Sequence, residues 1–147
     1  MTAAGVSKPV PVADEVSEEF WKAAANHVLA IQRCDECGWF SYPPSLTCRG
    51  CRLPGRSFHY EPVSGRGRVK TWTVVREAFL PSWKDEIPYP VAVVELDEQE
   101  GLYLTAQIVG ARPGDMAIGA PVEVVFEDLA EGISVPHFRL AEKRMGR

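Results

Sequence analysis

The sequence predicts a mainly β protein in which an N-terminal helix and a metal-stapled hairpin precede a small five-stranded barrel. Two observations support this fold class. All four cysteines fall within "CDECGWFSYPPSLTCRGC" (34–51), and the chain after residue 64 is a series of β-rich runs separated by turn residues. We expect an N-terminal arm and helix over 1–30, the cysteine module over 31–63, the barrel over 64–142 and a tail over 143–147.

The first thirty residues predict a flexible arm followed by one amphipathic helix. Asp14 and Ser17 can each accept hydrogen bonds from the free amides at a helix start, and apolar residues recur at helical spacing from Val16 to Ala24. Asn26 is a residue type that suits the C-terminal end of this helix. The opening residues have no apolar stretch typical of a signal peptide, and no apolar run is long enough to span a membrane. We therefore expect a cytoplasmic protein without a membrane partner, in which thiols stay reduced.

The two CxxC pairs are the strongest signal in the sequence. In such a knuckle the chain turns tightly, so that both sulfurs face one ion while backbone amides donate to them. Gly38, directly after the first pair, suits a position that often needs a positive φ. Four thiolates complete the tetrahedral coordination of Zn²⁺ and leave no position for a substrate, so we expect a structural zinc site. Its ligands would be Cys34, Cys37, Cys48 and Cys51.

Two redox alternatives stay open from the cysteines alone. Iron in the same four-sulfur site would make an electron carrier, although nothing else in the sequence suggests a redox partner. A thioredoxin-type dithiol is less consistent with the sequence, because neither CxxC opens a helix after a strand.

Five β-rich runs predict the barrel: 68–77, 91–98, 102–110, 121–129 and 133–140. A short helical turn is expected within 111–120. The connection "AFLPSWKDEIPYP" (78–90) is long and aromatic, so it either folds back on the barrel or meets a partner or ligand. Its candidate interface residues are Phe79, Leu80, Trp83 and Tyr89, to which the cysteine hairpin adds Trp39, Phe40 and Tyr42.

Positive charge is concentrated in one part of this acidic chain, whose net charge is -4. Six basic residues between 49 and 70 stand against the single acid Glu61. Such a patch is equally consistent with a solvated face and with a phosphate-binding site. The candidates for phosphate contact are Arg49, Arg52, Arg56, Arg66 and Arg68.

No self-sufficient active site emerges from the other residues. His27, His59 and His137 are far apart in the sequence, and we expect packing or surface roles for them. The chain has no GxSxG nucleophile elbow, and "GRG" (65–67) lacks the third glycine of a dinucleotide fingerprint.

With these motifs in order, the chain resembles a family of zinc-ribbon plus OB-fold proteins, long labelled a domain of unknown function, that accompany acyl-CoA-handling enzymes. The resemblance rests on "EEFWKAAANHVLAIQRCDECGWFSYPP", "VSGRGRVKTWTVV", "PYPVAVVELDE" and "IGAPVEVVFEDLAEGISVPHFR", which together cover about residues 17 to 140. It implies an N-terminal helix, a rubredoxin-like zinc ribbon and a five-stranded OB-fold barrel.

The resemblance also implies a function that depends on a partner. Family members typically lack independent catalysis and bind a thiolase-fold enzyme, such as a lipid-transfer-protein-like aldolase (a lyase) of steroid side-chain degradation or an acyltransferase. In the aldolase case, the partner would cleave a β-hydroxyacyl-CoA by a retro-aldol reaction while this chain supports complex assembly and acyl-CoA binding. Some members are fused to a hydratase-like domain. None is present in this sequence, which leaves open whether the chain stands alone or is part of a longer protein.

Single-stranded nucleic-acid binding is the alternative function, because zinc ribbons and OB-folds bind nucleic acids elsewhere. Such sites combine a basic groove with exposed stacking aromatics. The pI near 5.4 and the acids clustered between residues 95 and 100 oppose this alternative.

Overall fold

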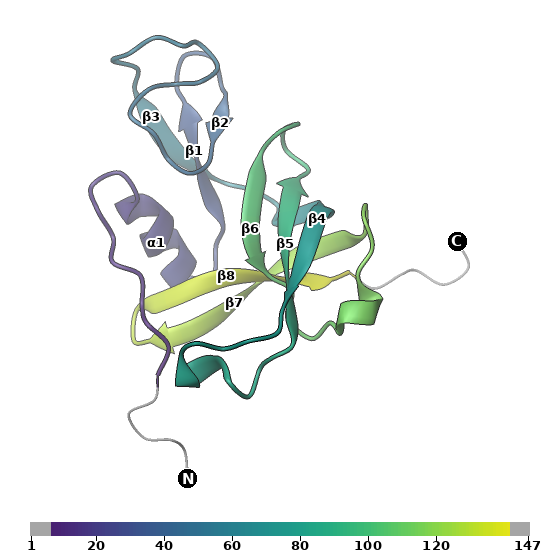
Figure 1. The fold of residues 1–147 in the computed structure, drawn as a ribbon. Helices are drawn as coiled ribbons and strands as arrows, with labels where there is room; N and C mark the ends of the chain where they lie inside the picture. The colour runs from purple at the N-terminus through teal and green to yellow at the C-terminus, as the bar shows by residue number, and fades with distance from the viewer. Residues whose placement is uncertain (1–6, 142–147) are drawn as a thin grey trace.

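Helix α1 (Glu18–Ala25) forms where the sequence predicts it in the computed structural model, which describes residues 7–141 (Figure 1). The predicted tail over 143–147 and the start of the arm lie outside these residues. Ser17 occupies the N-cap position and Asn26 the C-cap position. The Ser17 hydroxyl makes no capping hydrogen bond to the helix. It donates to the Asp14 carboxylate at 2.7 Å and closes the turn that joins the arm to the helix.

A three-stranded antiparallel sheet carries the cysteine module. It consists of β1 (Ala30–Cys34), β2 (Phe40–Ser41) and β3 (Phe58–Pro62), in the order β2-β1-β3. The first CxxC pair begins at the end of β1, and the second lies in the connection from β2 to β3. This is the arrangement of a zinc ribbon, in which two knuckles from separate parts of the chain face each other.

The remaining strands form a five-stranded barrel. They are β4 (Arg66–Val75), β5 (Tyr89–Leu96), β6 (Tyr103–Gln107), β7 (Pro121–Ala130) and β8 (Ile133–Leu140), hydrogen-bonded in the order β6-β5-β4-β7-β8. The two ends of this order meet in parallel, because Ile108 pairs with Phe138 and the Val109 amide donates to the Phe138 carbonyl at 2.8 Å. This order and closure are those of an OB-fold, which confirms the predicted fold class.

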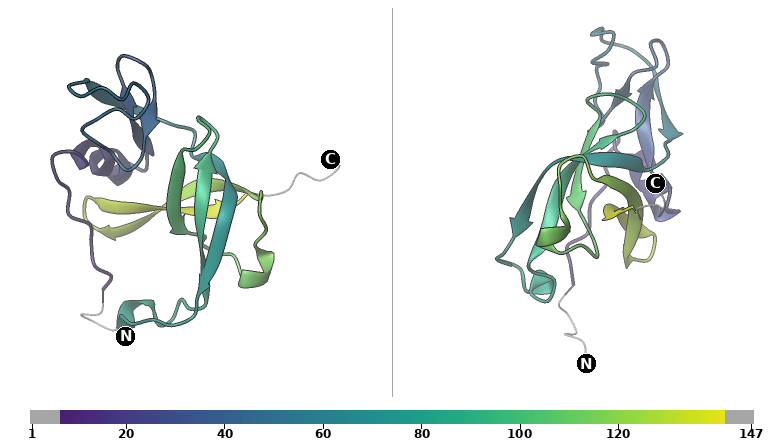
Figure 2. Two further views of the ribbon diagram at one scale, coloured as in Figure 1. Left: turned by 45° about the horizontal axis from the view of Figure 1, so that its top comes forward. Right: turned by 90° about the vertical axis from the view of Figure 1, so that its right-hand side faces the viewer.

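One apolar core joins the helix, the ribbon and the barrel. Phe20 of α1 and Ile31 of β1 belong to the same buried cluster as Val94 and Phe138 of the barrel. On β5 every second residue is buried, as expected for a strand with one face toward a core. The ribbon and the β4–β5 connection, which contains the 3-10 helix η1 (Pro81–Trp83), lie at opposite ends of the molecule (Figure 1 and Figure 2).

Two segments outside the main strands also have defined structure. The 3-10 helix η2 (Pro113–Asp115) is the helical turn predicted within 111–120. The arm, which the sequence predicts to be flexible, instead lies along the barrel, where Lys8 makes ion pairs with Glu86 and Glu127. Among residues 7–141, no helix has the length and apolar character needed to cross a bilayer.

Candidate metal centre and surrounding surface

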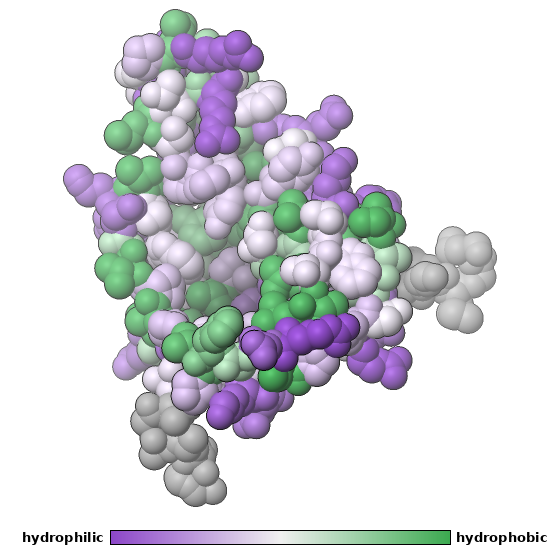
Figure 3. Space-filling model, in the orientation of Figure 1, coloured by the Kyte–Doolittle hydropathy of each residue, from purple (hydrophilic) through white to green (hydrophobic). Residues whose placement is uncertain are grey.

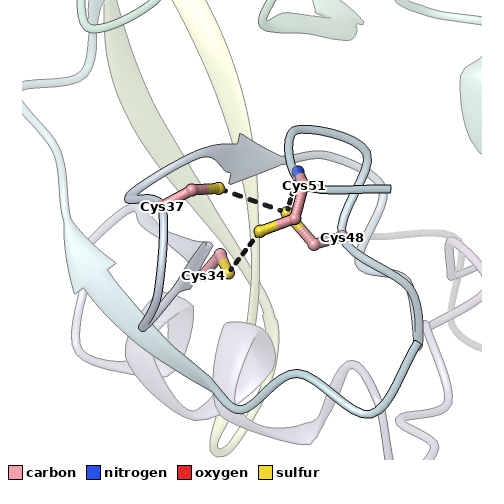
Figure 4. A group of neighbouring side chains, drawn as sticks. All are labelled: Cys34, Cys37, Cys48 and Cys51. Carbon is pink, nitrogen blue, oxygen red and sulfur yellow. Dashed lines mark hydrogen bonds between the residues drawn. The ribbon is translucent and has the colours of Figure 1, made fainter. Parts of the chain in front are cut away.

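The four cysteines converge on one point between the two knuckles (Figure 4). Their sulfur atoms all lie within 4.8 Å of one another, with 3.8 Å between Cys34 and Cys51 and 3.5 Å between Cys37 and Cys48. A tetrahedral Zn²⁺ site with Zn–S bonds of about 2.3 Å has sulfur–sulfur separations of about 3.8 Å. The donor set therefore fits zinc in number, chemistry and spacing, as the sequence predicts.

The two knuckles share one backbone design. The Gly38 amide donates to the Cys34 carbonyl at 3.0 Å, and in the second knuckle the Arg52 amide donates to the Cys48 carbonyl at 2.8 Å. Gly38 has a φ of 77°, which confirms the predicted positive φ, and Arg52 takes a φ of 61° at the equivalent position. The second knuckle thus holds a non-glycine residue in the left-handed region, and its guanidinium side chain is exposed beside the metal site.

The charge of the sulfur cluster favours a bound cation. Burial raises the pKa of the Cys48 thiol, but hydrogen bonds from the Cys51 amide and from neighbouring thiols outweigh this effect and lower the pKa to about 7. Hydrogen bonding to Cys37, together with burial, raises the pKa of Cys51 to about 12. Four thiolates therefore do not form together unless a metal ion offsets their charge, and metal binding is coupled to proton release.

Two glutamine side chains hold the metal module in place. Gln32, buried on β1, donates to the Ser45 carbonyl and accepts from the Ser45 amide, both at 2.9 Å, and so anchors the loop before the second knuckle. Gln99, in the β5–β6 turn of the barrel, makes the same pair of bonds to Phe40 of β2. Sequence reasoning missed both residues. The signal for Gln32 is a polar residue within the otherwise apolar "LAIQ" of a strand, whereas Gln99 lies in a polar turn that nothing sets apart.

The candidate arginines divide between two parts of the molecule. Arg49, Arg52 and Arg56 belong to the ribbon, and the first two are exposed, while Arg56 lies 4.0 Å from the Glu36 carboxylate. The barrel arginines Arg66 and Arg68 lie on β4 instead. Arg68 donates to the Gly119 carbonyl at 3.1 Å and borders a hollow that also contains Glu95, Asp97 and Glu100. Both groups therefore contain solvent-exposed arginines, and among the described residues neither Arg49 and Arg52 of the knuckle nor Arg66 and Arg68 of β4 form an ion pair within 4.0 Å.

The candidate interface residues differ widely in exposure. Phe79 and Leu80 of the β4–β5 connection are exposed, as is Trp39 of the ribbon. Trp83 and Tyr89 are half-buried against the arm, and Tyr42 packs against Phe20 of the core.

The assignment of Phe40 to an interface is corrected by the structure. Phe40 belongs to the buried core cluster and retains only 5% of its exposure, with the Arg33 guanidinium 4.6 Å from its ring centre. A side chain enclosed in this way has no surface to offer a partner. Phe40 is therefore a core residue and not part of a partner interface.

Each histidine pairs with a carboxylate. His59 contacts Asp35 and Glu61, and His137 lies 2.8 Å from Glu127. His27 lies 2.7 Å from an Asp128 oxygen that also accepts the Ser134 hydroxyl. Because His27 and Ser134 both bond to the carboxylate and not to each other, this cluster is not arranged to activate the serine as a nucleophile.

Two protein-family models match this chain. The model described as the rubredoxin-like zinc ribbon domain of ChsH2 matches residues 21–53, and the model described as the C-terminal OB-fold domain of ChsH2 matches residues 60–127. The chain belongs to the ChsH2 family. The label DUF35 is also attached to members of this family, including those described next.

Two curated relatives illustrate the range of the family. A DUF35 domain-containing scaffold protein of Methanocaldococcus jannaschii is 38% identical over 121 residues, which cover 80% of this chain and 82% of the relative. The 3-oxo-4,17-pregnadiene-20-carboxyl-CoA hydratase alpha subunit of Mycobacterium tuberculosis is 31% identical over 113 residues, which cover 76% of this chain but 34% of that subunit. The second relative therefore contains a large part that has no counterpart in this chain.

A solved structure called the Ltp2-ChsH2(DUF35) aldolase contains a chain that superposes with a TM-score of 0.77 at 30% identity. The match covers 88% of this chain and 98% of that chain. The helix, ribbon and barrel of this ChsH2 family member thus recur nearly whole in a chain of an aldolase structure.

Proposed function

We propose that this chain is a non-catalytic accessory subunit of an acyl-CoA enzyme. The observation that carries the proposal is the match to nearly the full length of a chain in the Ltp2-ChsH2(DUF35) aldolase. The names of the M. jannaschii scaffold protein and of the M. tuberculosis CoA hydratase alpha subunit support the same class of function. A closed four-thiolate zinc site, which leaves no coordination position for a substrate, agrees with a structural role for the metal.

The partner we propose is a thiolase-fold enzyme of the lipid-transfer-protein-like aldolase type, acting on a steroid side chain, with an acyltransferase as the alternative. In retro-aldol cleavage a base removes the proton of the β-hydroxyl group and the Cα–Cβ bond breaks. The β-carbon leaves as a carbonyl product, and the enolate of the CoA thioester is then protonated at its α-carbon. The partner supplies the base and the acid, and this chain contributes to assembly and to binding of the acyl-CoA.

The ribbon offers the groups that suit coenzyme A. Arg49 and Arg52 extend from the second knuckle, and a guanidinium group can bind a phosphate through two parallel hydrogen bonds. The zinc clip fixes the loop on which they stand, so the positions of their Cα atoms are set before a ligand arrives. The exposed Trp39 on the same ribbon is a candidate aromatic anchor at this end of the molecule, and Phe79 on the β4–β5 connection is a separate one at the opposite end (Figure 1).

Co-expression with a thiolase-fold aldolase of the same organism tests the proposal. We expect one complex in size-exclusion chromatography with light scattering, and cleavage of a β-hydroxyacyl-CoA at least tenfold faster than with the partner alone. Denatured and refolded chain without zinc serves as the control. A partner whose assembly and cleavage rate do not change when this chain is added would overturn the proposal.

A further inference from the structure

A cleft lies between the N-terminal arm, the β4–β5 connection and the end of the barrel away from the ribbon. Figure 3 shows the face of the molecule where these parts meet, which is hollowed between them. Lys8 of the arm enters this cleft. Its Nζ lies 2.5 Å from the Glu86 carboxylate, 2.9 Å from the Glu127 carboxylate and 5.5 Å from the centre of the Trp83 ring. The Lys8 side chain keeps only 13% of its exposure, which is unusual for a lysine near a chain end.

The barrel side of the cleft is built to hold a cation. Glu86 and Glu127 converge on a single nitrogen, and each is oriented by a second contact, from Gln107 at 3.3 Å and from His137 at 2.8 Å. Two partly buried carboxylates this close repel each other unless a positive charge lies between them. The Trp83 ring adds a face that attracts an ammonium group. Without Lys8, the cleft would therefore favour another cation of the same kind.

The arm has the features of a peptide ligand. In "SKPVPVA" (7–13) proline alternates with valine or lysine, a pattern that favours the extended polyproline II conformation, and the structure assigns no helix or strand there. Pro9 lines the cleft together with the aromatic residues Trp83 and Tyr89. Proline-rich segments bind aromatic grooves in this way at a low entropic cost, because they are ordered before they bind. The cleft thus contacts two features of the arm: its carboxylates bind the lysine, and its aromatic rings lie beside the proline.

The cleft remains open to a competing segment. The side chains of Glu86 and Glu127 retain 33% and 35% of their exposure even with Lys8 bound. Glu86 also belongs to the β4–β5 connection, which carries the exposed Phe79 and Leu80. A partner bound to those two residues would therefore lie close to the cleft.

We propose that this cleft is a recognition site for a lysine–proline segment of a partner protein, and that the chain's own arm occupies it until the partner displaces the arm. The arm then acts as a tethered competitor. Lys8 is paired with Glu86, which belongs to the β4–β5 connection. Displacement of the arm by a partner therefore also removes a contact that holds this connection in place. The proposal does not depend on acyl-CoA chemistry, because it rests only on the contacts of the arm.

Fluorescence anisotropy with two labelled peptides tests the site on the full chain. One peptide has the arm sequence SKPVPVA, and the other, SQPVPVA, replaces its lysine with glutamine. The Lys8→Gln chain should bind the lysine peptide at least tenfold more tightly than the unaltered chain does, because a tethered arm competes at an effective concentration of about millimolar. The glutamine peptide should bind the Lys8→Gln chain at least tenfold more weakly than the lysine peptide. Adding Glu127→Gln to Lys8→Gln should abolish binding of the lysine peptide.

Lys22→Gln, which alters an exposed lysine of α1, is the matched control and should bind like the unaltered chain. Circular dichroism and urea unfolding establish that each variant is folded, and Lys8→Ala replaces Lys8→Gln if the latter is not. Equal binding of the two peptides, or equal binding by the unaltered and Lys8→Gln chains, would overturn the proposal. Dimers that form only when Lys8 is present would assign the cleft to the arm of a second copy and would overturn the assignment to a partner protein.

Discussion

The side-chain amide of Gln99 makes both of its hydrogen bonds to the backbone of Phe40, each 2.9 Å long. Through this pair the β5–β6 turn of the barrel contacts β2 of the ribbon, next to the metal centre. A side-chain amide can replace a neighbouring strand in this way because it offers one donor and one acceptor in a fixed plane. Gln99 therefore links the orientation of the zinc ribbon to the barrel.

Gln99→Ala is expected to lower the free energy of unfolding by about 1–3 kcal/mol, because it leaves a partly buried amide and carbonyl without partners. Gln99→Glu should be at least as destabilising as Gln99→Ala, because it places a carboxylate oxygen against the Phe40 carbonyl oxygen that now accepts from Gln99. Urea unfolding of the zinc-loaded protein measures the effect. Glu100→Ala, at the exposed neighbouring position, is the control and should change the stability by less than about 0.5 kcal/mol. A Gln99→Ala protein as stable as this control would contradict the linking role.

The metal is expected to be zinc, with about one ion per chain from the single four-cysteine site. The purified protein should be colourless, whereas iron in the same site would absorb visible light. Removal of the metal with a chelator should collapse the amide NMR dispersion of the ribbon, while strands β5 and β8 of the barrel keep theirs. Cys48→Ser should lose most of its zinc affinity. A full complement of zinc in Cys48→Ser would show that the sulfur is not a ligand.

The contact between the arm and the barrel should depend on pH at both ends of the scale. Burial raises the pKa of Glu127, but hydrogen bonds from Lys8 and His137 outweigh it and hold the pKa below its usual 4.5. A depressed carboxyl pKa stabilises the fold above 4.5, and this contribution is lost as the pH falls through the lowered value. For Lys8, burial lowers the pKa, but Glu86 and Glu127 raise it above 10.5, so its contribution is present below 10.5 and is lost as the pH rises beyond that value.

The stability difference between the unaltered protein and Glu127→Gln measures this contact. It should shrink as the pH falls below about 4.5, where Glu127 becomes protonated, and as it rises above about 10.5, where Lys8 loses its proton. Glu131→Gln, which alters an exposed acid of the β7–β8 turn, provides the baseline. A difference that grows as the pH falls below 4 would have the wrong sign for a depressed carboxyl pKa.

Most of the fold and all of the metal ligands follow from the sequence, because both leave local patterns. The strand periodicity of β5 and the two CxxC spacings are examples. The sequence predicts that the first barrel strand starts at residue 68, whereas β4 starts at Arg66, since "SGRG" has the composition of a turn. Gly67 nevertheless pairs with Leu96 of β5, and this position needs a glycine because a Cβ atom there would lie 2.4 Å from the Glu95 carbonyl oxygen. The burial of Phe40 does not follow from the sequence, because a strand of two residues has no period that reveals its buried face.

The contacts of Lys8 and Gln99 could not be predicted for a different reason. Each joins residues that are distant in sequence, 119 positions apart for Lys8 and Glu127 and 59 for Gln99 and Phe40. No local pattern records such a pairing, since it depends on how the arm, ribbon and barrel pack after they form.

Substitution of an exposed aromatic residue should weaken partner binding without changing the stability of the fold. Phe79 is 91% exposed and packs against nothing that folding requires, so Phe79→Ser should leave urea unfolding unchanged. If it is an anchor of the interface, its loss should weaken binding to a thiolase-fold partner by about 2 kcal/mol, or roughly thirtyfold. Phe40→Ala should instead destabilise the fold by about 3–5 kcal/mol as a core truncation. Unchanged partner affinity in Phe79→Ser would show that Phe79 of the β4–β5 connection is not an anchor of the interface.

The arginines of the second knuckle should affect substrate binding in the complex and not the chemical step. If Arg49 and Arg52 contact the phosphates of coenzyme A, replacing both with glutamine removes charge that binds substrate and transition state alike. The KM for the acyl-CoA should then rise about tenfold while kcat stays the same. Arg112→Gln, which removes an exposed guanidinium beside η2, is the matched control and should leave KM unchanged. A fall in kcat with KM unchanged would place these arginines near the reacting atoms, while no change in either constant would make them solvated charges.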